Sequence, residues 1–120
     1  MTWVYDQTSG QIEHGGDTVA VGYAGAGSCK NDPYQQDIHN RGPIPRGLYT
    51  IGAPHDTPTH GPYVLRLEPD PTNDMCGRSG FLIHGDSVSK PGTASQGCII
   101  LPRAARVRIW ESGDTDLEVI

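Results

Sequence analysis

Residues 81–100 read FLIHGDSVSKPGTASQGCII, and this stretch joins two short apolar runs through a loop of small and polar residues. The first run ends at His84-Gly85, and the second begins at Gly97-Cys98. Apolar runs bounded by Gly and Pro are typical of short strands. We therefore expect two strands side by side at a sheet edge, with His84 ending one and Cys98 beginning the other.

Similar short runs occur along the whole chain and predict a mainly β domain. Residues 2–7 and 11–14, with Thr8-Ser9-Gly10 between them, predict an opening hairpin. Further strands are expected at residues 17–27, 47–52, 63–69, 80–85, 97–101 and 116–120. The segment from Ser28 to Pro45 carries three prolines and no sustained period, which predicts a long surface loop.

One short helix is expected near the C-terminus, in PRAARVRIWESG at residues 102–113. Pro102 suits the first helical position, and Gly113 suits a left-handed cap after the last turn. Ala104, Val107 and Trp110 recur at every third position, which predicts an apolar stripe against the sheet.

Length and charge limit the classes of protein to consider. A chain of 120 residues predicts one domain, residues 1–120, and the net charge of −5 argues against nucleic acid or an anionic membrane as partner. No apolar run reaches the roughly 18 residues of a membrane span, which predicts no membrane insertion. The N-terminus lacks the pattern of a signal peptide, so we expect synthesis in the cytoplasm.

The three cysteines leave two interpretations open. Cys29 and Cys76 either pair in a disulfide or are two ordinary buried thiols, and Cys98 is then an odd, free thiol. Cys98 beside a base would be a nucleophile, because a thiol attacks as the thiolate, and His84 is the natural base. Gly97 would allow close approach of a substrate carbonyl and free local N–H groups for an oxyanion. Taken alone, each residue is more often structural.

The segment HGDSVSKPGTASQGCI resembles the active-site segment of the YkuD-type L,D-transpeptidases. With GRSGFLIHGD, ASQGCIIL and the upstream GPIPRGLYTIG in order, the chain is more closely similar to the toxic L,D-transpeptidase effector (Tlde) family of type VI secretion systems. The similarity covers nearly the whole chain. It implies a single L,D-transpeptidase-like β-sandwich or barrel domain with one short helix near the C-terminus.

The resemblance also implies roles at the site. Cys98 would be the nucleophile, His84 the general base, and the Gly85 carbonyl the group that orients the imidazole. The N–H groups of Gly97 and Cys98 would form the oxyanion hole. Gln96 stands where the YkuD motif has a second His.

Ile100 stands where that motif has Arg or Asn two residues after the cysteine. These two departures concern the binding subsites and leave the nucleophile and base in place.

The implied activity is that of a cysteine L,D-carboxypeptidase or L,D-transpeptidase without metal or cofactor. Its substrate would be the tetrapeptide stem of peptidoglycan, cut between diaminopimelate and the terminal D-Ala. The implied setting is an antibacterial toxin that a secretion machine carries into the periplasm of a target bacterium, with a cognate immunity protein as partner.

Supporting or substrate-binding roles are expected for a few neighbours. Arg78 and Lys90 would bind substrate carboxylates or would be solvated surface charges. Asp86 would steer the imidazole, bind an ammonium group or cap a turn. Ser95 would fix Cys98 by hydrogen bonds within the loop, and Gln96 would contact substrate.

The sequence also suggests three other interpretations. A caspase-type peptidase is excluded by Ile99-Ile100 after the cysteine and by the short His–Cys spacing. A metal site drawn from the five histidines (His14, His39, His55, His60 and His84) lacks close helical spacing, and residues 55–60 fall in a Pro-rich loop. A non-catalytic wall-binding or structural module with an inert Cys98 remains the alternative.

Overall fold

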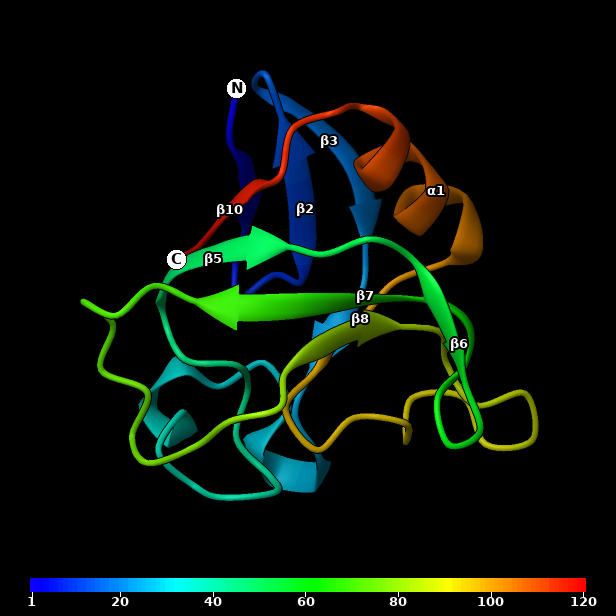
Figure 1. Cartoon of the computed structure of the whole chain (residues 1–120). Coiled ribbons are helices and arrows are strands. Elements are labelled where there is room, and N and C mark those ends of the chain that lie inside the picture. The colour runs from blue at the N-terminus through cyan, green and yellow to red at the C-terminus, as the bar shows by residue number, and fades with distance from the viewer.

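Ten strands form one mixed sheet in the computed structural model, which describes all 120 residues (Figure 1). The strands are β1 (Trp3–Tyr5), β2 (Gln11–His14), β3 (Asp17–Val21), β4 (Tyr23–Ala24), β5 (Gly47–Ile51), β6 (His55–Thr57), β7 (Gly61–Pro69), β8 (Leu82–His84), β9 (Ile99–Ile100) and β10 (Asp116–Val119). Their order is β3-β2-β1-β10-β5-β7-β8-β9-β4, and β6 pairs with β7. The expected opening hairpin is confirmed by the antiparallel pairing of β1 with β2.

The two end strands of this sheet are consecutive in the chain. Only Gly22 separates β3 from β4, although β3 pairs with β2 and β4 pairs with β9 at the opposite end. The sheet therefore curls until its ends come close, and it stays open because no ladder joins β3 to β4. A Cβ at Gly22 would lie 1.8 Å from the Ile100 carbonyl oxygen, so the approach requires glycine.

The core fills the inside of this curved sheet. Seventeen buried side chains form one cluster, which joins Trp3 and Tyr5 of β1 to Ile83 of β8 and Ile99 of β9. Strands from both halves of the sheet thus contribute to a single core. The expected mainly β domain with one helix near the C-terminus is confirmed, as an open curved sheet without barrel closure.

The helix α1 (Arg103–Glu111) packs beside β7 and β8 and is followed by Gly113, whose φ is +77°. Pro102 is the N-cap residue, so the helix begins at Arg103, one residue later than expected. The expected stripe of Ala104, Val107 and Trp110 is wrong in part, since Ala104 is exposed whereas Trp110 is half-buried and packs against the core.

The buried face of α1 is formed by Ala105, Arg106 and Ile109. The prediction missed this face because it counted apolar residues only. Arg106 is charged, and yet its side chain is buried among them.

The loop between Ser28 and Pro45 contains two short 3-10 helices, Gly27–Cys29 and Pro33–Gln35. The expectation of a surface loop is wrong for its last part. Residues 42–45 are buried, and Ile44 belongs to the core. The expected loop at residues 55–60 is wrong in part, since β6 occupies its first half.

The three cysteines form no disulfide. Cys29, Cys76 and Cys98 are all free thiols in this structure, so residues 29 and 76 are not paired. None of the helices has the length and apolar character needed to cross a membrane.

Gly22→Ala should lower the free energy of unfolding by about 1 to 3 kcal/mol, because its methyl group would collide with the Ile100 carbonyl where the sheet ends meet. Chemical denaturation measures this loss. Gly52→Ala is the matched control, since a Cβ there makes only ordinary contacts with Arg66. Equal stability of the two variants would contradict the close approach at Gly22.

Candidate active site

The parallel pairing of β8 with β9 decides which way the candidate residues face. Ile83 pairs with Ile99, and both side chains lie in the core. Successive side chains on a strand point to opposite faces, so His84 and the residue before Ile99, Cys98, face away from the core. The expectation that these strands are neighbours is confirmed, although β4 lies beyond β9 and covers the expected sheet edge.

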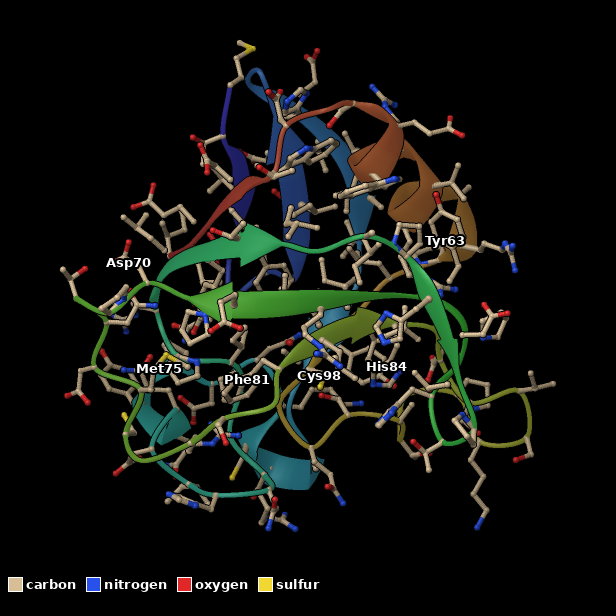
Figure 2. All side chains as sticks on the ribbon, viewed as in Figure 1. Tyr63, Asp70, Met75, Phe81, His84 and Cys98 are labelled. Atoms are coloured by element: carbon tan, nitrogen blue, oxygen red, sulfur yellow. The ribbon has the colours of Figure 1, made fainter.

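His84 and Cys98 line one cleft of about 980 Å³. In Figure 2 the labelled side chains of Phe81, Cys98 and His84 follow one another beneath β7, and all three line this cleft. The cleft is walled by three loops, which contribute residues 39–40, 59–62 and 77–81, and by the crossover between β8 and β9. The structure thus brings together the two residues that the sequence singles out.

The His84 ring is buried and fixed by its own chain. Its Nδ1 lies 2.9 Å from the Gly85 carbonyl oxygen. A carbonyl only accepts, so Nδ1 carries the proton and Nε2 is left as the basic nitrogen of the neutral ring. Burial lowers the pKa of His84, and the neighbouring His60 and Arg106 lower it further against the opposing effect of the Gly85 backbone.

The Cys98 thiol is half-buried and has a backbone donor directed at it. The Leu82 N–H donates to its Sγ at 3.3 Å. Burial raises the pKa of Cys98, while the Leu82 amide and the Arg78 guanidinium act in the opposite direction. Raised thiol and lowered imidazole pKa values both favour the uncharged form, so the resting pair is a neutral thiol and a neutral imidazole.

Gly97 is enclosed by the protein on the side where a side chain would stand. A Cβ there would lie 2.5 Å from Arg78 Nη2 and 2.9 Å from Phe81 Cε1, and the Gly97 φ is +140°. The glycine is therefore needed for internal packing.

The Gly97 N–H donates to Ser95 Oγ at 3.0 Å, so it is already engaged. The Cys98 N–H donates to no backbone carbonyl, and within the chain it acts only on its own thiol, whose pKa it lowers. Of the two expected oxyanion donors, only the Cys98 amide is free.

Arg78 is buried and donates hydrogen bonds to four backbone carbonyls. Its Nη1 donates to the Gln36 and Pro43 oxygens at 2.6 and 3.0 Å, and its Nη2 donates to the Gly42 and Gln96 oxygens at 2.9 and 3.1 Å. These bonds hold the buried end of the long loop against the Cys98 loop. The expectation of a solvated surface charge is wrong for Arg78, because its side chain is buried. Arg78 lines the cleft, with both Nη atoms bonded to carbonyls, and substrate binding by it stays a prediction.

Ser95 occupies the supporting place expected for it. Its hydroxyl donates to the Cys98 carbonyl at 2.7 Å and accepts from the N–H groups of Gly25 and Gly97. Gln96 is exposed at the cleft, with its carbonyl bound by Arg78.

Asp86 caps the turn of the crossover loop. It accepts from the N–H groups of Ser87 and Gly92 and from the Tyr23 hydroxyl at 2.6 Å. This supports the turn-capping role among those expected. Lys90 is exposed in the same loop and does not line the cleft.

Two cleft residues were missed by sequence reasoning. The His60 ring lies 4.6 Å from that of His84, centre to centre, and Arg106 lies buried beside Gly85. A His in a Pro-rich loop and an Arg within a helix carry no local signal for this placement. No three His, Cys, Asp or Glu side chains form a group able to hold a metal ion.

Most of the chain matches the model of a known domain family. Residues 18–116 match the model of the Tlde1 domain, and no curated protein matches the chain. The matched residues include every strand from β4 to β9, both sides of the cleft, and the segment that carries His84 and Cys98. Since the match covers most of the chain, this protein belongs to the Tlde1 domain family, the type VI secretion L,D-transpeptidase effectors.

Proposed function

We propose that the whole chain is one catalytic domain that acts on the tetrapeptide stems of peptidoglycan. It attacks the carbonyl at the L-centre of diaminopimelate and expels the terminal D-Ala. Water then completes an L,D-carboxypeptidase reaction, or an incoming amine completes an L,D-transpeptidase reaction. The family supports this substrate, and the cleft that holds His84 and Cys98 supports this chemistry.

Cys98 and His84 carry the first half of the proposed reaction. Sγ attacks the carbonyl carbon as its proton passes to Nε2 of His84, which gives a tetrahedral oxyanion and an imidazolium. The free N–H of Cys98 is the donor for that oxyanion. The carbon–nitrogen bond then breaks, the imidazolium protonates the leaving amine, and a thioester remains on Cys98.

The second half reverses the roles of the same groups. Neutral His84 takes a proton from water or from an acceptor amine, which attacks the thioester carbonyl. The carbon–sulfur bond breaks, and the proton returns to the thiolate, so the resting thiol is restored. The Gly85 carbonyl keeps Nδ1 protonated throughout, and Nε2 is thereby the atom that exchanges the proton.

This proposal depends most on the common placement of His84 and Cys98, which face away from the core and line one cleft. A wall-binding module with an inert cysteine needs neither a fixed imidazole tautomer nor an amide directed at the sulfur. The enzyme is therefore preferred to the binding module.

The family also supports the proposed setting. The protein is a toxin delivered by a secretion machine to the periplasm of a target bacterium, where the stems are found. Its natural antagonist is an immunity protein that blocks the cleft.

Cys98→Ala should abolish release of D-Ala from purified muropeptides, by more than about a thousandfold, because the thioester cannot form. His84→Ala should reduce it by about a hundredfold to ten-thousandfold through loss of the base. Mass spectrometry of the stems measures both. Cys76→Ala is the matched control, a free cysteine outside the cleft, and should keep full activity. Release of D-Ala by the Cys98→Ala variant would refute the proposal.

The pH profile of kcat/KM should have its acid limb below pH 6.5, because burial lowers the pKa of His84 and the neutral ring is the base. The sign follows from protonation: activity falls as pH drops through the lowered pKa. Alkylation of Cys98 by iodoacetamide should be slow at neutral pH, and its rate should still be rising at pH 9.0, because burial raises the thiol pKa and little thiolate forms below it. Fast alkylation near pH 6 would instead indicate a thiolate–imidazolium pair.

Export of the protein to the periplasm should arrest growth of a bacterial host, whereas expression in the cytoplasm should be tolerated, because the stems lie outside the inner membrane. Growth curves and cell shape provide the measurement. Exported Cys98→Ala is the control and should be harmless. Equal tolerance of the exported active and Cys98→Ala proteins would count against the toxin.

A further inference from the structure

A second buried arginine lies at the cleft with part of its guanidinium unused. Arg106, in the first turns of α1, is only 5% exposed. Its Nε donates to the Leu101 oxygen at 3.2 Å, and its Nη1 donates to the oxygens of Pro62 and Tyr63 at 2.8 and 2.9 Å. Its Nη2 makes no hydrogen bond within the chain. Three backbone carbonyls therefore fix the guanidinium and leave one edge free.

The free edge opens to the cleft beside the proposed base. Arg106 lines the same cleft as His84 and Gly85. A Cβ placed on Gly85 would lie 2.9 Å from Nη2, so this nitrogen packs directly against the residue after His84. Tyr5 Oη is the only fully buried side-chain nitrogen or oxygen without a partner, which means that Nη2 is reached by solvent.

No carboxylate of the chain neutralises Arg106. The two ion pairs of the protein both involve Asp114, which does not line the cleft. A buried cation without a counter-ion is unfavourable, and carbonyl oxygens offset only part of that cost. The planar guanidinium is suited to carboxylates, which accept charge-assisted hydrogen bonds. An anion that enters through the cleft would supply the missing partner.

We propose that Nη2 of Arg106 binds a carboxylate of the substrate next to His84. This inference rests on the proposed function, because the stem peptide supplies the anion. Two carboxylates of the stem are candidates: that of the terminal D-Ala, one carbon from the leaving nitrogen, and the side-chain carboxylate of diaminopimelate. Both have the same chemistry, so the experiment separates them.

The first test uses the Cys98→Ala chain, which binds the stem without turning it over. Calorimetry compares the tetrapeptide L-Ala-γ-D-Glu-diaminopimelate-D-Ala with its C-terminal carboxamide and with its diaminopimelate carboxamide. One of the two amides should bind about tenfold to a hundredfold more weakly, since a charge-assisted hydrogen bond is lost. The weaker amide identifies the carboxylate. Equal binding of all three peptides would refute the inference.

The second test assigns the preference to Arg106. Arg106→Gln, in the Cys98→Ala background, should bind the acid and the sensitive amide equally, as the mutant presents no cation. Arg103→Gln is the matched control, because Arg103 lies on the same helix, is exposed and does not line the cleft. It should keep the preference. Loss of the preference in the control alone would refute the assignment.

Arg106→Gln also removes donors to three carbonyls, so its folding is checked by circular dichroism. The peptide comparison in the first test does not depend on this variant and decides the inference even if the variant unfolds.

The inference and the proposed function fail in different ways. If the active enzyme releases D-Ala from the tetrapeptide while Cys98→Ala binds all three peptides equally, Arg106 is not the carboxylate site and the function stands. If no peptide is processed but the preference for the acid persists, the function is wrong and the carboxylate site stands.

Discussion

The parallel pairing of β8 with β9 is the constraint on which the site depends. Parallel neighbours need a long connection, and residues 85–98 supply it as an irregular crossover instead of a helix. Ile83 and Ile99 fix the register because both must enter the core. A slip of one residue would turn Cys98 into the core and remove it from the cleft. Gly22 supports the pair, since only a glycine lets the chain cross at the Ile100 carbonyl.

Buried arginines hold the irregular segments around this pair. Backbone carbonyls in segments without a ladder must still find donors when they are buried. Arg78 serves four of them and Arg106 serves three, in each case joining segments that are distant in sequence. Both guanidiniums line the cleft and neither pairs with a carboxylate. An acidic chain thereby places two arginines and one carboxylate, that of Asp86, around the cleft, a balance that suits the proposed peptide substrate.

The local features of this chain were predictable from sequence, and the long-range ones were not. Apolar runs between glycines and prolines located most strands, and Pro102 with Gly113 bounded the helix closely. His84 and Cys98 were placed together because two such runs flank one loop. The role of Arg106 was hidden, since its acceptor Pro62 lies 44 residues away and periodicity reports only near neighbours. Periodicity also predicted an apolar stripe on α1 that differs from its buried face.

Burial of both groups shapes the chemistry proposed for the cleft. Separating charge between a half-buried thiol and a buried imidazole is costly, so the resting site is neutral. The Leu82 N–H and Arg78 already stand where they stabilise negative charge on Sγ. Their attraction is strongest once the proton has moved to His84, which is when bond formation begins. Groups that favour the charged state more than the resting state lower the barrier without deepening the ground state. In this mechanism burial keeps the thiol unreactive in the absence of substrate. The Leu82 N–H and the Arg78 guanidinium stabilise the sulfur's negative charge only when substrate is bound and the proton moves to His84.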